Sequence, residues 1–182
     1  KLALYLFFNY SYVKIYSLKH SGERMTKKFW TGTVIPQLKP NEIFVFGSNP
    51  EGIHGAGGAR AALAFGAQFG VGRGLVGKTY ALPTKNLTEG FVEPATGIKY
   101  VIAGDCSVST EQIRENIKEL YDVARANPTL DFLITFQYET FEDGTQKRSL
   151  SGYTSQETFE MFTKEQDIPD NIVFHDSYKE RL

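Results

Sequence analysis

The sequence lacks the residues on which several classes of protein depend. It has one cysteine, Cys106, so an intramolecular disulfide or a cysteine-built zinc site is excluded. Its three histidines, His20, His54 and His175, show no metal-ligand spacing such as His-x-x-x-His. We therefore predict no metal site and no cofactor. The scarcity of cysteine agrees with a reducing compartment and a cytoplasmic protein.

An excess of charge and a long apolar run are also missing. The formal net charge of −1 indicates no broad basic surface that would bind nucleic acid. Nucleic acid is therefore unsupported as a partner. No apolar run approaches the roughly 20 residues of a membrane-spanning helix, so we expect no membrane association. With 182 residues, 41% hydrophobic and 23% charged, the chain fits one globular domain with extensions.

The first 24 residues differ in composition from the rest. Leu, Phe, Tyr, Asn, Lys and Ile dominate residues 1–18, yet Asn9 interrupts the apolar run and no signal-peptide cleavage site precedes Met25. AT-rich untranslated DNA read as protein has this composition, and Gly22-Glu23 can be encoded by a purine-rich ribosome-binding sequence. We hypothesise that residues 1–24 are a non-native or disordered leader and that residues 25–182 are the domain.

The domain alternates strand and helix patterns. Residues 139–148 are polar and carry Asp143-Gly144, which predicts a turn or a hairpin tip. Alternating strands and helices predict an α/β fold: a single three-layer domain with a mixed, partly parallel sheet and helices on both faces. Strands are predicted at residues 43–46, 79–82, 99–103, 130–136 and 171–174, and helices at residues 55–70, at 109–127 and from Thr154 onward, the last two opened by capping sequences.

Glycine is concentrated in one segment. Ten of the seventeen glycines lie in residues 47–77, directly after the first predicted buried strand. Glycine lets backbone N–H groups approach a ligand and converge on an anion. A helix that begins directly after Gly55-Ala56-Gly57-Gly58 would add its positive dipole end. We predict that this loop binds a phosphate-bearing ligand.

Residues 72–79 also match the Walker A pattern G-x-x-x-x-G-K-T, with Lys78 as its lysine. That motif needs a strand before it and a helix after it, whereas here a predicted helix precedes and a strand-like segment follows. Residues 100–105 resemble a Walker B strand. A P-loop NTPase that uses residues 72–79 is therefore kept as an alternative.

The segment from Phe44 to Lys85 resembles a family of small, uncharacterised bacteriophage-encoded proteins. These proteins carry F-G-S-N-x-x-G-x-H-G-x-G-x-A followed by a run similar to Y-A-I-P-T-K. More distantly, the order of strand, Asn, glycine loop and helix is similar to the macro domain, which binds ADP-ribose. The resemblance implies a macro-domain-like fold, with Asn49 at the distal ribose and Ser151 and Gly152 near a second phosphate loop.

The resemblance also implies a set of ligand-binding residues, but this chain departs from the family patterns at two places. The second loop of the phage family is glycine-rich, whereas this chain has Arg148-Ser149-Leu150-Ser151-Gly152. Ala59-Arg60 stand where hydrolytic macro domains often carry an acid, which puts hydrolysis in doubt. The expected ligand-binding residues are Gly47, Ser48, Asn49, Gly52, Gly55, Ala56, Gly57, Gly58, Ser151 and Gly152. Arg60 is added to them because a cation in the first turn of the predicted helix is unfavourable with the helix dipole unless an anion lies near.

Three readings of the function follow. As an enzyme, the protein would be an ADP-ribose phosphatase or an ADP-ribosyl hydrolase, with Asn49 and His54 as the catalytic residues. As a binder, it would sequester an ADP-ribose-type signal of host defence in the host cytoplasm, as a phage counter-defence protein. A third reading is a non-enzymatic module that binds a host protein and has no affinity for nucleotides.

Overall fold

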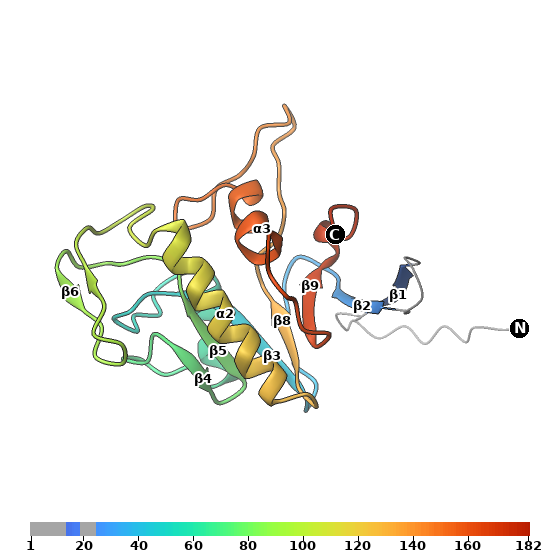
Figure 1. Ribbon diagram of the computed structural model, residues 1–182, viewed down its shortest axis with the longest axis horizontal. Coiled ribbons are helices and arrows are strands. Elements are labelled where there is room, and N and C mark those ends of the chain that lie inside the picture. Colours follow the sequence, from blue (N-terminus) through green and yellow to red (C-terminus); the bar gives the residue numbers. More distant parts are fainter. Residues whose placement is uncertain (1–13, 19–24) are drawn as a thin grey trace, which may run out of the picture.

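The computed structural model describes residues 14–18 and 25–182, which form a seven-stranded sheet with helices on both faces (Figure 1). Neighbouring strands from β2 to β5 are parallel, whereas the outermost strands β1 and β4 run antiparallel to theirs. The order across the sheet is β1 (Lys14–Leu18), β2 (Met25–Trp30), β9 (Ile172–His175), β8 (Asp131–Ile134), β3 (Glu42–Ser48), β5 (Thr79–Pro83) and β4 (Gly74–Val76).

Successive side chains of the buried strands point to opposite faces of the sheet, so the core has two layers. In β3, Ile43 and Val45 pack toward α2 (Thr110–Ala126) and α3 (Ser155–Thr163), whereas Phe44 and Phe46 pack toward α1 (Gly57–Ala62). Figure 1 shows α2 and α3 in front of the sheet. Because both faces of the central strands are covered, these strands read as continuous apolar runs. The predicted three-layer α/β fold with a mixed sheet is confirmed.

The two longer helices begin where their capping sequences predict. Ser109 Oγ accepts a hydrogen bond from Gln112 N, but the Gln112 side chain bonds to Asn116, so only half of that capping box forms. At α3 the box is complete, because Thr154 and Glu157 each cap the backbone of the other. Buried residues on one face of α2 seat it on the sheet: Ile113, Ile117, Leu120, Tyr121 and Ala124.

Two predicted elements were wrong in extent. The helix expected over residues 55–70 has six residues in α1, followed by a short 3-10 turn, Leu63–Phe65. Gly66, with φ of 101°, then adopts the left-handed conformation that ends helices. The strand expected over residues 99–103 shrinks to β7 (Lys99–Tyr100), which pairs only with β6 (Phe91–Val92) in a hairpin separate from the main sheet.

The polar segment 139–148 forms the predicted hairpin. Phe141 N donates to Thr145 O over 2.7 Å, and Asp143 accepts from Thr145 in the turn. The hairpin rises beyond α3, away from the sheet (Figure 1). Arg148 then bridges to Thr154 and leads the chain into α3.

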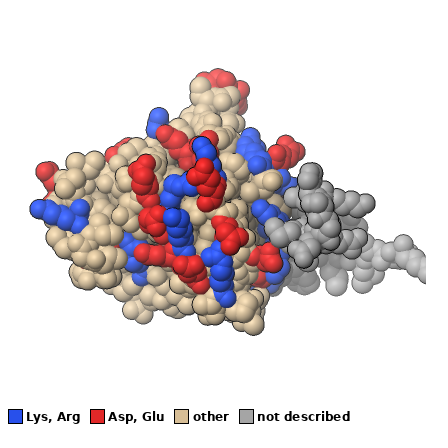
Figure 2. Space-filling view, viewed as in Figure 1, with Lys and Arg blue, Asp and Glu red and all other residues tan. Residues whose placement is uncertain are grey.

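The predicted leader is described only in part. Residues 1–13 and 19–24 lie outside the described residues, whereas Lys14–Leu18 form β1, with Lys14 opposite Phe29 and Leu18 opposite Met25. The position of the native start stays a prediction. Within the described chain, no helix combines the length and the apolar character that crossing a membrane requires. On the face that carries α2 and α3, charges of both signs are interspersed (Figure 2).

Candidate functional site

The site lies where the connections of two neighbouring strands diverge. From the carboxyl end of β3 the chain passes through α1 to β4 and β5, whereas from that of β8 it passes through α3 to β9 on the other side. Ligands of open α/β sheets bind in the crevice that such a divergence leaves beyond the strand ends. The topology thus places a binding crevice beyond Ser48 and Ile134.

A cavity of about 610 Å³ occupies this crevice. Its volume falls within the range of roughly 300–1,000 Å³ of small-molecule sites. Segments that follow β2, β3, β5 and β8 form its walls together with residues 149–151. Its lining includes eight of the predicted ligand-binding residues, namely Gly47, Ser48, Asn49, Gly55, Ala56, Gly57, Gly58 and Ser151.

The glycine loop that lines this cavity has backbone donors without acceptors. Ala56 is extended, and Gly57, the first residue of α1, is left-handed with φ of 52°. The N–H groups of residues 55–58 donate to no atom in the part of the chain that the structure describes. Left- and right-handed residues in succession point neighbouring N–H groups into one concavity that suits an anion. The six residues of α1 add only a small helix dipole to this loop.

The loop of residues 149–151 forms the opposite wall. A Cβ placed on Gly57 would lie 2.7 Å from Leu150 Cδ1, so Leu150 lies directly over the glycine loop. Ser149 and Ser151 join their hydroxyls at 2.7 Å, and Ser151 O accepts from Cys106 N over 2.7 Å. The two loops together enclose the space between them.

Among the described lining residues, Lys85 alone has an ionisable side chain, and the sequence analysis missed it. Its ammonium donates to Asp105 Oδ1 over 2.8 Å and to Leu150 O over 2.9 Å. A lysine has three N–H donors, so one is left for a ligand. The strand pairing explains its position, because β5 is parallel to β3 with Pro83 opposite Ser48, and Lys85 follows two residues later.

Asn49 lines the cavity, but its amide group is occupied within its own loop. Asn49 Nδ2 donates to Ile53 O over 2.7 Å, and Asn49 Oδ1 accepts from Ile53 N over 2.8 Å. Ser48 likewise donates its hydroxyl to Gly72 O. These bonds fix the turn that delivers the chain from β3 to the glycine loop, so Asn49 acts here as a turn former.

His54, predicted as catalytic, is absent from the cavity lining. The side chain is only 1% exposed and packs edge-on against Phe46 and beside Phe69. Its Nε2 lies 2.9 Å from Gln68 O and can donate to it. His54 is therefore a buried side chain that packs among aromatic rings.

Three predicted ligand residues also lie outside the lining, each for a physical reason. A Cβ on Gly52 would lie 2.3 Å from Val71 N, and one on Gly152 would lie 2.6 Å from Asp105 Cβ, so both glycines permit close backbone packing. Arg60 was placed near an anion because it stood early in a long helix. In the short α1 it falls in the last turn, where a cation is favourable without a ligand.

The Walker-like segment lacks the geometry of a P-loop. Residues Gly74–Val76 form β4, which turns at Gly77 and pairs antiparallel with β5, so no helix follows the motif. Lys78 Nζ donates to Lys39 O over 2.8 Å, and neither residue lines the cavity. Residues 100–105 belong mostly to a loop and form no strand of the main sheet.

The described lining of the cavity has few ionisable side chains. It contains no carboxylate, imidazole, thiol or phenol, as far as the described residues show. Elsewhere in residues 14–18 and 25–182, no group of His, Cys, Asp and Glu is arranged to hold a metal ion. Phe136 lines the cavity as an aromatic surface, and a Cβ on Gly47 would lie 3.0 Å from its ring.

The chain matches no protein-family model, and neither curated proteins nor solved structures include a significant match.

Proposed function

We propose that the protein binds a nucleotide of the ADP-ribose class in the cavity beyond β3 and β8, and that it holds this ligand without hydrolysing it. The observation that carries the proposal is the glycine loop of residues 55–58, which lines a cavity of about 610 Å³ and has unused N–H groups. Such donors suit a diphosphate, and the free N–H of Lys85 would add a charge-assisted bond.

The apolar part of the lining supports a ligand with an aromatic base. Phe136 is partly exposed and contributes its ring, whereas Trp30 borders the cavity with a buried indole whose Nε1 donates to Ile134 O over 2.8 Å. Base faces stack on aromatic side chains without regard to base identity. A nucleotide therefore fits the mixture of apolar wall and anion-binding loop.

The described lining has no carboxylate or imidazole, and its one ionisable side chain, Lys85, is paired with Asp105, which favours binding over hydrolysis. A protein of this kind would remove a nucleotide signal from its surroundings. In the host cytoplasm this would act as counter-defence, as the resemblance to phage-encoded proteins suggests.

The test is a thermal-shift and calorimetric comparison of the full chain with ADP-ribose, NAD, magnesium-ATP and GTP. Ligand at about a hundredfold above Kd should raise Tm by about 5 °C or more. We expect this rise with ADP-ribose, and recovery of the ligand unchanged after long incubation. Turnover of many equivalents would refute the non-hydrolytic part of the proposal.

Two lysines provide a matched pair of variants. Lys85→Gln should weaken ADP-ribose binding about tenfold, because one charge-assisted hydrogen bond is lost. Lys78→Gln should leave it unchanged, since Lys78 binds Lys39 O outside the cavity. A Tm rise only with magnesium-ATP that Lys78→Gln abolishes would instead support the P-loop alternative. Asn49→Ala is a poor probe, because it also breaks the turn.

A second candidate is a module that binds a host protein through the rim of the cavity. The observation in its favour is that four rim side chains, Val34, Ile53, Leu87 and Leu150, are apolar and 41–67% exposed. If none of the nucleotides raises Tm, this candidate takes precedence.

A further inference from the structure

A second cavity of about 320 Å³ adjoins the first. The two share part of their walls, so a ligand in one lies close to the other. The second cavity is otherwise enclosed by the legs of the hairpin of residues 139–148 and by the first turn of α3. The shared wall residues are Thr33, Thr135, Phe136, Gln137 and Ser149.

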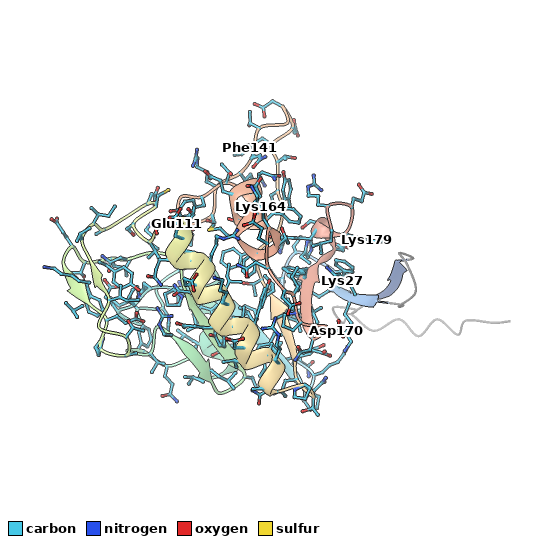
Figure 3. All side chains as sticks on the ribbon, viewed as in Figure 1. Lys27, Glu111, Phe141, Lys164, Asp170 and Lys179 are labelled. Atoms are coloured by element: carbon cyan, nitrogen blue, oxygen red, sulfur yellow. The ribbon has the colours of Figure 1, made fainter. Side chains whose placement is uncertain are left out.

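Hydrogen bonds to the start of α3 hold the second cavity in shape. Ser155 Oγ donates to Glu139 O over 3.0 Å and accepts from Glu139 N over 3.0 Å. Ser155 N donates to Lys147 O, and Lys147 N donates to Glu139 O, so both legs are tied to one residue of the helix. Figure 3 shows Phe141 on the part of the hairpin that rises beyond this junction. The base of the hairpin is therefore preorganised.

The second cavity differs from the first in its charge. Lys147 and Arg148 line it, and Glu139 is the only carboxylate among its described lining residues. Lys147 Nζ lies 3.5 Å from Glu139 Oε1, with both side chains about half exposed, and 5.7 Å from the Phe141 ring. Such exposed pairs contribute little, so an anion can compete for the ammonium. Arg148 Nη1 donates to Gly152 O, which leaves other guanidinium donors.

Neutral polar groups complete the wall. Gln137 uses its Nε2 on Thr33 O, which leaves its amide oxygen as an acceptor for a hydroxyl. Thr158, from the first turn of α3, also lines this cavity. Two cations with hydroxyl and amide groups suit a phosphate on a sugar.

We propose that the second cavity binds an additional phosphate of the same ligand, carried on a ribose outside the diphosphate. The inference rests on the proposed function, because the diphosphate of this ligand occupies the first cavity. The chemical class is thus a nucleotide with a phosphomonoester, for which ADP-ribose 2′-phosphate is a suitable probe. Lys147 and Arg148 bind the phosphomonoester and determine the preference for it.

Calorimetry of the full chain with ADP-ribose and ADP-ribose 2′-phosphate tests the inference, with inorganic phosphate as a third titrant. The phosphorylated ligand should bind at least about tenfold more tightly, since it gains charge-assisted hydrogen bonds. The double variant Lys147→Gln/Arg148→Gln should lose this advantage while its affinity for ADP-ribose stays within about threefold. A control with the same charge change, Lys99→Gln/Lys118→Gln, should keep the advantage, because both lysines are exposed elsewhere.

The possible results separate the two proposals. Equal affinity of the wild type for both ligands, or an advantage that survives in the double variant, would overturn the inference and leave the proposed function in place. Binding of neither ligand would overturn both. Inorganic phosphate that binds as tightly as ADP-ribose 2′-phosphate would also overturn the inference. If the double variant melts early, Lys147→Gln alone replaces it, because that ammonium makes only exposed contacts.

Discussion

Individual glycines in the crowded segment serve different purposes, which the geometry separates. A Cβ on Gly72 would lie 2.0 Å from Asn49 O, a distance that neither backbone can accommodate without moving. A Cβ on Gly55 would meet nothing within 4 Å. Gly72 is therefore required for packing of the two loops, whereas Gly55 is open toward the cavity.

Gly72→Ala should destabilise the protein by about 2 kcal/mol or more, because the methyl group forces the two loops apart. Gly55→Ala should change the free energy of unfolding by no more than about 0.5 kcal/mol. Urea unfolding followed by circular dichroism measures both. Equal midpoints for the two variants would show that the close approach at Gly72 does not contribute to stability.

At the scale of elements, Arg73 joins three segments that are distant in sequence. Its guanidinium binds both oxygens of Glu93 in the β6–β7 hairpin, at 2.7 and 2.9 Å, and also Asn116 and Glu119 of α2. Asn116 in turn donates to Pro83 O at the end of β5. The network therefore positions the strand end from which Lys85 reaches the cavity.

This network makes stability depend on pH. Burial by itself raises the pKa of Glu93, but Arg73, Thr96 and Tyr100 outweigh it and lower that pKa below its ordinary value of 4.5. The unfolded chain thus binds a proton at a higher pH than the folded chain. The carboxylate stabilises the fold fully above pH 4.5, and this contribution is lost as the pH falls through the folded pKa.

Glu93→Gln should lower the stability at pH 7 by about 3 kcal/mol, because Arg73 loses its principal buried partner. The variant should also lose less stability than the wild type on acidification below pH 4.5. Thermal unfolding from pH 7 to pH 3 measures both effects. Glu115→Gln is the control, since Glu115 forms an exposed pair with Lys118. An unchanged acid dependence in Glu93→Gln would contradict the assignment.

At the scale of the whole molecule, β1 is the edge strand of the sheet among the described residues and pairs there with β2 alone. A chain that begins at Met25 keeps β2 and its parallel partner β9. We expect its Tm to lie within about 4 °C of that of the full chain, which corresponds to about 1 kcal/mol. A markedly lower Tm, measured by calorimetry, would show that residues 1–24 contribute to the fold.

Strands and helices could be predicted where the local sequence of one segment determines the structure. The run of residues 43–46 predicted β3, because strands covered on both faces are apolar throughout. Thr154 and Glu157 marked the start of α3 through local capping. Residues 101–102 were wrongly predicted to be part of a strand, because Val101 and Ile102 are apolar. They are nevertheless 66% and 54% exposed, and only the tertiary structure determines this exposure.

The sequence predicted the parts of the candidate site that are contiguous in the chain, but not the contacts between segments that are distant in sequence. The glycine loop and Ser48 were identified because they directly follow a predicted strand. Lys85 and Leu150 are 65 residues apart in sequence, so their contact, and the role of Lys85, needed the sheet order. His54 was assigned to catalysis because it is next to the loop, and only the packing of Phe46 and Phe69 shows that its ring is buried.

The strand order also constrains how the protein is made. β9 lies between β2 and β8, so residues 172–175 connect two parts of the sheet that are synthesised much earlier. Until the ribosome has released these residues, β2 and β8 each expose an unpaired edge to other nascent chains. Synthesis of the last strand therefore completes the sheet, and chains stalled before residue 172 should be the ones that chaperones hold.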